Sequence, residues 1–405
     1  MEKKSDNIKI ALIGNMNNNF FGIKRYFEDF GFECTLFNYN NLPDHFHPKN
    51  DTWKFDKHEK SIVTLNYGNP YLEVFPKEDK TVFEDFDICI GDGFTPFYFE
   101  KMGLELDIFV PYGSDLSELP FKMEINFKSI KFFLISILHN LFICRKQLKG
   151  IRKTTQIITI NHIKFLKEAF QKINRTSLPW STPMVYLEKE NKNIDFSKYV
   201  EISVFEEFSF RIFSHSRQSW GDKKEEKKGN DKGNDELIRG FYQFNKKYKN
   251  SCLVLFEYGP SIHKSKILID ELGIKNNVIW VKKMPRKYIL ALIKKFSSIG
   301  ADQFKTGYFG STCYELMSQG TPVLNYVKWT PQEFKEKVGR PFPPIINVNK
   351  SINISKALEK YYLDENQLKR LSHESEEYFV KYLGKGAALK YKDEVLRLFN
   401  QKKSY

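Results

Sequence analysis

Residues 8–37 read IKIALIGNMNNNFFGIKRYFEDFGFECTLF, and their pattern indicates the fold class. An apolar run, 8–13, ends at Gly14, where a backbone without a side chain can turn sharply. Apolar residues then recur at helical spacing between 20 and 30, and a second apolar run follows at 34–37. Strand, helix and strand in this order predict a parallel βαβ unit, and hence an α/β fold.

Further apolar runs extend this first sheet. They are 87–91, 106–111 and 156–160. A long helix is expected from 128 to about 149, whereas 42–80 shows no regular pattern and is predicted to be an excursion of loops. A charged run near residue 190 follows, so we predict an N-terminal Rossmann-like domain at 1–190.

The same alternation starts again in the second half of the chain. Strands are expected at 210–213, 253–256, 278–281, 299–301 and 322–324, with helices at 236–247, 264–272, 286–296 and 312–318. This predicts a second doubly wound, Rossmann-like domain at 205–375. A helical tail, 376–405, is expected to pack back toward the N-terminal domain. Two such domains facing each other across a cleft would bind a ligand at the carboxyl ends of their strands.

The composition is that of a folded protein without a membrane-spanning segment. Of 405 residues, 41% are hydrophobic and 28% charged, which excludes a disordered chain. The longest nearly apolar run, 130–144, is shorter than the ~20 residues that a spanning helix needs. The charged start, 1–9, lacks the apolar stretch of a secretory signal. The five cysteines form no CxxC pair, so buried free thiols in a cytoplasmic protein are expected.

The chain is strongly basic, with 64 Lys and Arg against 50 Asp and Glu and a net charge of +14. Such an excess attracts polyanions, acidic lipid surfaces or phosphorylated substrates, and a compositional bias toward lysine is the alternative. Residues 127–153 combine an aromatic, apolar stretch with a basic end. This pattern predicts peripheral contact with an anionic membrane, and a core helix with a solvated basic end is the other interpretation.

The most informative segment for function is 302–323, DQFKTGYFGSTCYELMSQGTPV. A loop with two glycines runs into a short helix, and Gly310, Ser311 and Thr312 lie where free backbone N–H groups point outward. Together with the positive end of the helix dipole, these groups suit a diphosphate. Glu315 lies one turn further, where its carboxylate can accept hydrogen bonds from hydroxyl groups. An ordinary capped loop is the alternative.

Three parts of this segment resemble the donor-site motif of GT-B glycosyltransferases of the GT4 type, the glycosyl transferases group 1. They are Phe309-Gly310, Glu315-Leu316-Met317 and Gly320-Thr321-Pro322-Val323. The resemblance implies that Glu315 holds the ribose of a nucleotide sugar, and that Phe309, Gly310, Ser311 and Thr312 complete the donor site. The family usually carries an earlier glutamate eight positions before, and this chain has Gly307 there.

The same resemblance implies cations for the leaving diphosphate. It places an arginine and a lysine after the first strand of the second domain, and the matching residues are Arg217 and Lys232. Two developing negative charges require fixed cations, and arginine can bind phosphate with a bidentate fork. The tetrapeptide KGND occurs twice in tandem, so Lys228 is a rival to Lys232. A solvated charge run is the alternative for the whole stretch.

In the first domain, Tyr112-Gly113-Ser114-Asp115 resembles the His-Gly-Ser-Asp arrangement that faces the donor sugar in many relatives. Tyr112 takes the place of the histidine and would face the transferred sugar as a hydrogen-bond donor. A turn held by the Asp115 carboxylate is the alternative. Gly14 and Asn15, after the first strand, match the acceptor-side turn of the family.

The resemblance therefore implies a retaining, metal-independent glycosyltransferase without a cofactor. It would move a sugar from a nucleotide-sugar donor to a saccharide or lipid-linked acceptor, in the assembly of cell-envelope polysaccharide or glycolipid. We expect it in the cytoplasm or peripherally at the inner face of the membrane, with no nucleic-acid partner. The alternatives are a nucleotide-sugar epimerase of GT-B fold and a non-catalytic, polyanion-binding relative.

Overall fold

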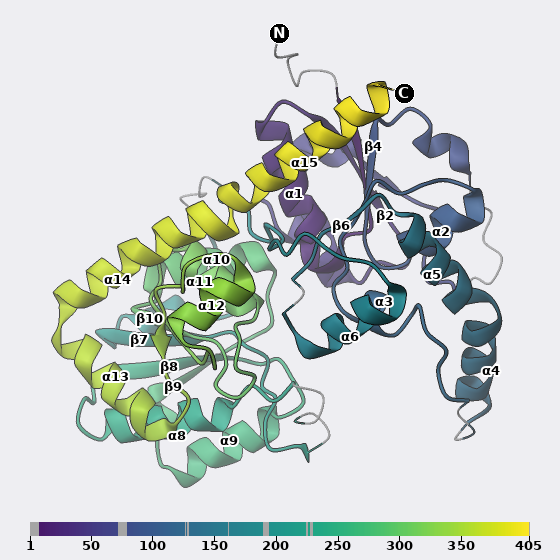
Figure 1. Cartoon of the computed structure of the whole chain (residues 1–405). Coiled ribbons are helices and arrows are strands. Elements are labelled where there is room, and N and C mark those ends of the chain that lie inside the picture. The colour runs from purple at the N-terminus through teal and green to yellow at the C-terminus, as the bar shows by residue number, and fades with distance from the viewer. Residues whose placement is uncertain are drawn as a thin grey trace. The chain divides into compact units, whose positions relative to one another are not determined.

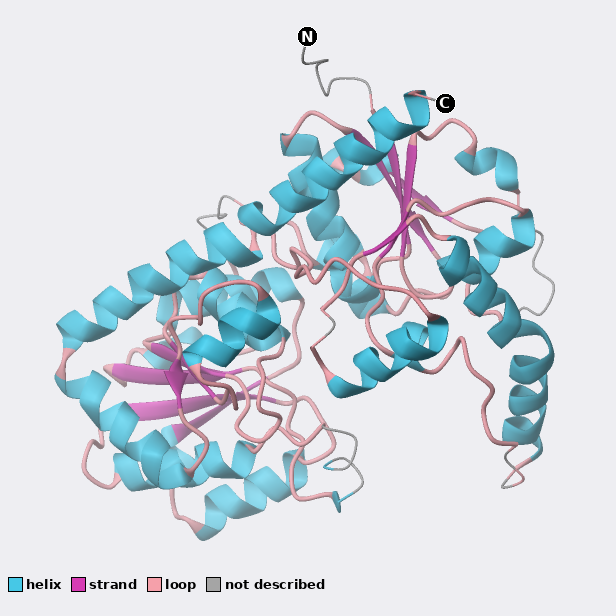
Figure 2. Cartoon of the chain, in the orientation of Figure 1, coloured by secondary structure: helices cyan, strands magenta, loops and turns pink. Residues whose placement is uncertain are grey.

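The computed structural model describes residues 8–71, 79–125, 127, 129–160, 162–188, 194–223, 226 and 230–404. The chain divides into two compact units. The N-terminal unit comprises Met1–Tyr186, Lys337–Gly339 and Tyr382–Tyr405, and the C-terminal unit comprises Leu187–Glu336 and Arg340–Lys381. Each unit contains one parallel sheet with helices packed around it (Figure 1, Figure 2).

The sheet of the N-terminal unit has six parallel strands in the order β3-β2-β1-β4-β5-β6. They are β1 (Lys9–Ile13), β2 (Glu33–Asn38), β3 (Ile62–Thr64), β4 (Ile88–Gly91), β5 (Ile108–Phe109) and β6 (Gln156–Ile157). The helices of this unit are α1 (Asn19–Asp29), α2 (Thr95–Met102), α3 (Ser114–Ser117), α4 (Ile130–Leu138), α5 (Cys144–Lys153), α6 (Lys164–Ile173) and α15 (Lys385–Lys403). A π-helical stretch, His139–Ile143, joins α4 to α5, so 130–153 is one continuous helical segment, as predicted from 128 to about 149, although it ends a few residues later.

The prediction that 42–80 forms only loops was wrong at one place. β3 extends the sheet beside β2, with Leu36 opposite Ile62. The strand has three residues, and two of them are exposed. Such a short edge strand needs little apolar sequence, and periodicity cannot detect it.

Two apolar cores cover the two faces of β1, because successive side chains of a strand point to opposite sides. Ala11 and Ile13 belong to one core, which α2, α5 and α6 complete. Ile10 and Leu12 belong to the other, which lies beneath α1 and α15. α15 contributes Tyr391, Val395 and Leu398 to this second core. The last helix of the chain is therefore an integral part of the N-terminal unit.

The C-terminal unit has a second parallel sheet in the order β12-β11-β10-β7-β8-β9. Its strands are β7 (Phe210–Ser214), β8 (Ser251–Phe256), β9 (Val278–Val281), β10 (Ile299–Ala301), β11 (Val323–Asn325) and β12 (Ile346–Asn347). Its helices are α8 (Asn234–Asn245), α9 (Ile262–Glu271), α10 (Arg286–Phe296), α11 (Ser311–Ser318), α12 (Pro331–Val338), α13 (Ser351–Leu363) and α14 (Glu365–Tyr378). All six residues of β8 are buried, as expected for a central strand of a parallel sheet.

Two properties expected from the sequence agree with the structure. All five cysteines are buried and free. Among the helices of the described ranges, none is both long enough and apolar enough to cross a bilayer.

Candidate functional site

The strand order of the C-terminal unit brings two loops together. β7 lies between β8 and β10, so the chain continues to one side of β7 and later returns on its other side. This reversal is the position where doubly wound sheets bind ligands. The loop after β7 and the loop after β10 meet there, since the Lys232 carbonyl accepts a hydrogen bond of 2.8 Å from the Phe304 N–H. The Ser216 hydroxyl also donates to Asp302 Oδ1 at 2.9 Å.

The start of α11 is positioned by Asp302, the first residue after β10. Its Oδ2 atom accepts a 2.6 Å hydrogen bond from the Gly310 N–H, immediately before the helix. Gly300 allows α11 to approach the sheet closely, because a Cβ there would lie 2.5 Å from the Leu316 side chain. The N–H groups of Ser311 and Thr312 are the first of α11, and the first N–H groups of a helix have no intrahelical acceptor. This end is therefore suited to an anion.

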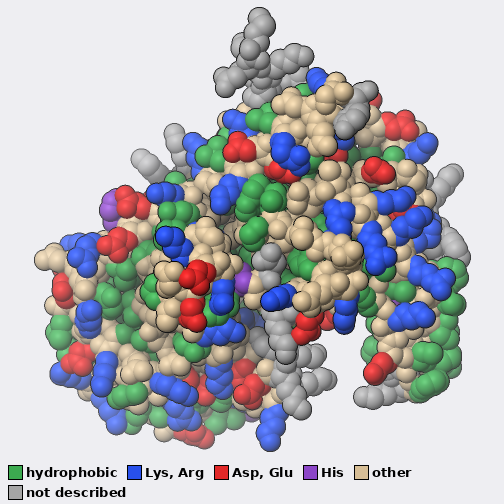
Figure 3. Space-filling model, viewed as in Figure 1, with side chains coloured by type: hydrophobic (Ala, Val, Ile, Leu, Met, Phe, Trp, Pro, Cys, Tyr) green, Lys and Arg blue, Asp and Glu red, His purple; other side chains and the backbone are tan. Residues whose placement is uncertain are grey.

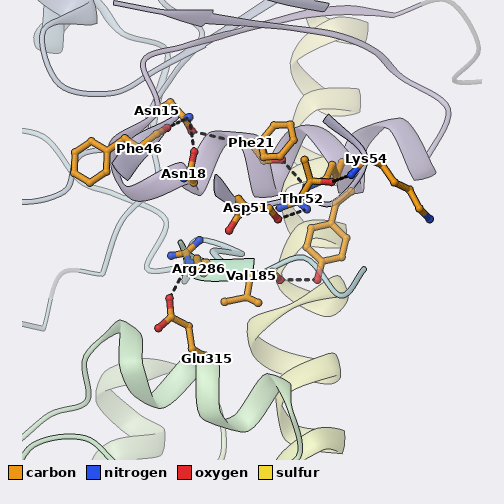
Figure 4. A network of polar contacts seen from close by, with 12 residues as sticks. Asn15, Asn18, Phe21, Phe46, Asp51, Thr52, Lys54, Val185, Arg286 and Glu315 are labelled. Atoms are coloured by element: carbon orange, nitrogen blue, oxygen red, sulfur yellow. Dashed lines mark hydrogen bonds and ion pairs between the residues drawn. The ribbon is translucent and has the colours of Figure 1, made fainter. Parts of the chain in front are cut away.

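Glu315 lies one turn into α11, is buried, and is held on both carboxylate oxygens. Oε1 accepts a hydrogen bond of 2.7 Å from Arg286 Nε, the first residue of α10 (Figure 4). Oε2 lies 2.7 Å from His215 Nε2, directly after β7. Burial alone would raise the pKa of the Glu315 carboxyl, but the charge of Arg286 and the hydrogen bond from His215 bring that pKa below its ordinary value. Glu315 is therefore ionised at neutral pH.

Two cations lie near the start of this helix. Lys232 Nζ donates a 2.5 Å hydrogen bond to Gln303 Oε1, and Gln303 in turn donates to the Tyr308 carbonyl at 2.5 Å. Burial lowers the pKa of Lys232, and the nearby positive charge of Arg217 lowers it further, against the opposing effect of Asp302. Arg217 lies in the loop after β7, beside Gly259. A Cβ at Gly259 would lie 2.7 Å from the Arg217 side chain, so the glycine leaves room for the arginine. The two cations that the sequence assigned to a diphosphate are therefore neighbours.

The structure thus brings together most of the predicted donor-site residues within the C-terminal unit. They are Arg217, Lys232, Gly310, Ser311, Thr312 and Glu315. Phe309 is buried in an aromatic cluster, with ring centroids 4.3 Å from Tyr308 and 5.4 Å from Tyr314, so it supports the loop. The rival cation Lys228 lies outside the described residues.

Tyr112, in the N-terminal unit, follows β5 in a turn organised by Asp115. The N–H groups of Tyr112 and Gly113 donate to Asp115 Oδ1 at 3.0 and 2.9 Å. This is the turn held by the Asp115 carboxylate, which was the alternative interpretation of the motif. The Tyr112 hydroxyl is buried. Burial and then the charge of Asp92 raise its pKa well above the ordinary value, so this hydroxyl keeps its proton at neutral pH.

Gly14 and Asn15 form the turn after β1. The Asn15 side chain is buried and donates to the Phe46 carbonyl at 2.9 Å and to Asn18 Oδ1 at 3.0 Å (Figure 4). Its own Oδ1 accepts from the Phe21 N–H at 3.1 Å. Asn15 therefore holds its own loop together. Gly14 has a φ of +91°, and a Cβ there would lie 1.8 Å from Asp92 Oδ1.

Sequence reasoning assigned no role to several residues of these sites. They are His215, Arg286, Asp302 and Gln303 in the C-terminal unit and Asp92 in the N-terminal unit. Each lies one or two residues after a strand or begins the next helix, and this position is the local signal that they carry. Within the described residues, no three or more His, Cys, Asp or Glu side chains are grouped to hold a metal ion.

Comparison with known proteins connects this site to a family. Residues 228–378 match the family model "Glycosyl transferases group 1", and this range contains Lys232, Gly310 and Glu315. No curated protein matches the sequence significantly. The match confirms the resemblance that the motif of the C-terminal unit indicated.

Solved structures resemble the whole chain at low sequence identity. Anabaena HepE in complex with UDP and glucose has a TM-score of 0.54 at 12% identity, over 96% of this chain and 100% of its own. A variant of S. aureus TarM, in complex with fondaparinux, α-GlcNAc-glycerol and UDP, has a TM-score of 0.55 at 11% identity, over 97% and 100%. The lipopolysaccharide outer core galactosyltransferase WaaB in its apo form has 0.51 at 13%, over 96% and 99%. These similarities confirm the predicted fold class, two Rossmann-like units of the GT-B type.

Proposed function

We propose that this protein is a glycosyltransferase that moves a sugar from a nucleotide-sugar donor to a saccharide or lipid-linked acceptor. The observation that carries the proposal is the arrangement at the switch point of the C-terminal unit. There, two neighbouring cations, the N-terminus of α11 and an ionised, buried glutamate occur together. A diphosphate joined to a ribose needs these groups, and the family match covers the same segment.

In the proposed reaction, Arg217 and Lys232 neutralise the leaving diphosphate, so that no metal is required for this purpose. The N–H groups of Ser311 and Thr312 bind phosphate or sugar, and Glu315 accepts hydrogen bonds from the ribose. The acceptor oxygen forms a bond to the anomeric carbon as the bond to the diphosphate breaks. With attack on the face that the diphosphate leaves, configuration is retained and the leaving phosphate takes the acceptor proton.

The similar structures suggest which donors and acceptors to test first. HepE was solved with UDP and glucose, and the TarM variant with UDP, fondaparinux and α-GlcNAc-glycerol. WaaB is named as a galactosyltransferase of lipopolysaccharide. We therefore propose a uridine nucleotide sugar as the first candidate donor, and cell-envelope polysaccharide or glycolipid assembly as the setting.

The first test is thermal unfolding of the protein with a panel of nucleoside diphosphates and nucleotide sugars in the presence of EDTA. A ligand at 100 times its dissociation constant adds about 2.7 kcal/mol of stability. We expect one nucleotide to raise the unfolding temperature, and that nucleotide sugar to be consumed when an acceptor is added. A donor converted without any acceptor would indicate an epimerase. No shift with any nucleotide would contradict the proposal.

Replacing Arg217 tests the role of the cations in catalysis. Because a fixed positive charge stabilises the transition state more than the ground state, Arg217→Ala should lower turnover by roughly two to three orders of magnitude. The control is Arg239→Ala, an exposed arginine of α8 in the same unit. Steady-state kinetics with the identified donor distinguish the two variants. Full turnover in Arg217→Ala would exclude this assignment.

The proposal extends to peripheral contact with the inner face of a membrane. An apolar tip, which we define as the exposed residues Phe127, Ile130, Phe132, Leu134, Leu141 and Phe142, lies on and beside α4. Phe127 and Ile130 are 79% and 80% exposed. Figure 3 shows hydrophobic side chains gathered over the region of α4, with basic side chains beside them. The exposed basic residues are Lys131, Arg145, Lys149, Arg152 and Lys153.

The charges around the apolar tip favour an anionic bilayer over another protein copy as its partner. A second copy would bring its own basic helix against this one, and like charges would repel. A bilayer with anionic headgroups offers apolar depth for the tip and negative charge for the basic residues of α5. Lys149 and Lys153 also pair with Glu100 at 2.5 and 2.9 Å, whereas within the described residues Lys131, Arg145 and Arg152 form no ion pair with a carboxylate.

Vesicle cosedimentation tests the membrane contact. We expect binding to phosphatidylglycerol vesicles that weakens with salt and is small for neutral phosphatidylcholine vesicles. The double substitution Ile130→Ser and Leu134→Ser should reduce binding at least about tenfold, because each buried CH₂ contributes about 0.8 kcal/mol. Leu363→Ser, at a 66% exposed leucine of α13, is the matched control. Unchanged vesicle binding in the double variant would contradict the membrane contact. A wild-type protein that is a dimer, with a double variant that is a monomer, would also contradict it, because the apolar tip would then bind a second copy.

A further inference from the structure

Glu315 stands between two side chains from distant parts of the C-terminal unit. Arg286 Nε binds Oε1 at 2.7 Å, and His215 Nε2 binds Oε2 at 2.7 Å. The glutamate and histidine side chains are buried, and that of Arg286 is largely buried. Two polar side chains, one from the start of α10 and one from the loop after β7, converge on the carboxylate of α11, so the arrangement belongs to the tertiary structure and not to a local turn.

The two neighbours leave the carboxylate able to bind more. A carboxylate oxygen has two acceptor positions, and each oxygen of Glu315 uses one for its neighbour. The remaining positions suit a pair of adjacent hydroxyl groups. Hydrogen bonds to an ionised acceptor are roughly twice as strong as those to a neutral one. Whether Glu315 is ionised therefore affects how tightly such hydroxyls bind.

Arg286 supplies the charge that opposes the effect of burial. A buried carboxyl without a cation becomes neutral, because burial disfavours the charged form. Among the groups that face Glu315, the charge of Arg286 makes the largest contribution to lowering its pKa, and His215 makes the next. Loss of Arg286 would therefore leave a glutamic acid that binds its proton at higher pH.

His215 adds an observation that points to a ligand. Its Nδ1 atom is buried and has no hydrogen-bond partner among the described residues. The ring is held against Phe256, at 5.9 Å between centroids in an edge-on arrangement. A buried polar atom without a partner is unfavourable, and a ligand bound in the site would supply the missing hydrogen bond.

We propose that Arg286 is a positioning residue that keeps Glu315 ionised and, with His215, directs it toward the ribose hydroxyls of the donor. The inference rests on the proposed function, since it requires the nucleotide to bind at this site. Arg286 acts through Glu315 and need not touch the donor. It determines how strongly the site distinguishes a nucleotide with ribose hydroxyls from one without them.

Calorimetric titration with UDP and with 2′,3′-dideoxy-UDP tests the inference. The wild-type protein should bind UDP roughly tenfold or more tightly than the dideoxy compound, because charge-assisted hydrogen bonds are lost with the hydroxyls. Glu315→Gln and Arg286→Gln should weaken UDP binding by a similar factor and bind both compounds nearly equally. Arg239→Gln, at an exposed arginine of α8, should leave the discrimination unchanged.

The pH dependence of binding separates a positioning role from a purely structural one. In Arg286→Gln, UDP affinity should fall with decreasing pH at a higher pH than in the wild-type protein, since Glu315 then takes up its proton sooner. Arg286→Lys retains the positive charge and should restore most of the discrimination and the wild-type pH profile. This conservative variant also provides the test if Arg286→Gln does not fold.

The outcomes distinguish this inference from the proposed function. If the wild-type protein binds neither compound, both the donor assignment and the role of Arg286 are wrong. If the wild-type protein discriminates and Arg286→Gln discriminates equally, only the role of Arg286 is wrong. A folded Arg286→Lys variant that binds both compounds equally would also overturn the role of Arg286. A positive charge at this position would then be insufficient for discrimination between the two compounds.

Discussion

Gly307 stands where the resemblance to GT4 enzymes would place a second carboxylate, and its backbone explains the difference. Its φ is +74°, a conformation that residues with a Cβ rarely adopt. A Cβ there would lie 3.0 Å from Cδ of Lys328, whose N–H donates to the Gly307 carbonyl at 3.1 Å. A glutamate is thus excluded from this loop without rearrangement, so in the proposed reaction other groups would bind the donor sugar.

Alanine at this position should therefore destabilise the protein. Gly307→Ala should lower the free energy of unfolding by about 1–2 kcal/mol through the left-handed backbone, with a further loss from the Lys328 contact. Gly273→Ala is the matched control, since Gly273 has a φ of +65° and open space around it. Urea unfolding measures both variants. An equal loss in the two would show that the Lys328 contact has no effect.

α15 is the element whose place in the molecule is least evident from its position in the chain. It closes one core of the N-terminal unit, beside α1 and β4, although it comes after the whole C-terminal unit in sequence. Apolar side chains on one stripe of the helix meet the sheet, and charged residues cover the rest. α11, in contrast, is positioned by residues close to it in sequence. Asp302 accepts a hydrogen bond from the Gly310 N–H before the helix, and Gly300 of β10 leaves room for Leu316.

Removing one buried side chain from α15 tests its contribution. Leu398→Ala should destabilise the N-terminal unit by about 2–5 kcal/mol, because Leu398 is 2% exposed and its loss leaves a cavity. Leu389→Ala, at a 40% exposed position of the same helix, should change stability by less than about 0.5 kcal/mol. Denaturant unfolding measures both. Similar values for the two variants would contradict the packing of α15.

A buried carboxyl in the N-terminal unit makes the stability of the molecule depend on pH. Asp92 follows β4 and accepts a hydrogen bond of 3.0 Å from the Met16 N–H. Burial raises its pKa to about 8, against the opposing effect of that hydrogen bond. Between about pH 4 and pH 8 the folded state therefore holds a proton that the unfolded chain releases. Stability contributed by this group falls as the pH rises through that window.

Asp92→Asn should remove the loss of stability that accompanies a rise in pH, because asparagine does not ionise. The variant should melt roughly several degrees above the wild-type protein at pH 8, and the difference should disappear toward pH 4. Asp85→Asn, at an exposed aspartate before the same strand, is the control and should not alter the pH profile. Calorimetric melting at several pH values provides the comparison. A difference that grows toward low pH would contradict the assignment.

Local pattern was sufficient for most of the fold. Apolar runs and helical spacing predicted the alternation of both units, because a parallel strand and an amphipathic helix each have a periodicity within a few residues. The donor motif was also predictable for this reason. Gly310, Ser311, Thr312 and Glu315 lie within one loop and two turns of a helix, so their relative placement follows from helix geometry.

Contacts between distant residues were beyond that pattern. Glu315 meets Arg286 across 29 residues of sequence and His215 across 100, and α15 reaches α1 across most of the chain. The order of the strands determines these encounters, and periodicity carries no information about strand order. The short edge strand β3 escaped prediction for the same reason, since pairing with β2 defines it. Sequence therefore predicted the elements and the motif at 302–323. The folded sheet determined which side chains hold Glu315, because only strand order brings β7, α10 and α11 to one edge.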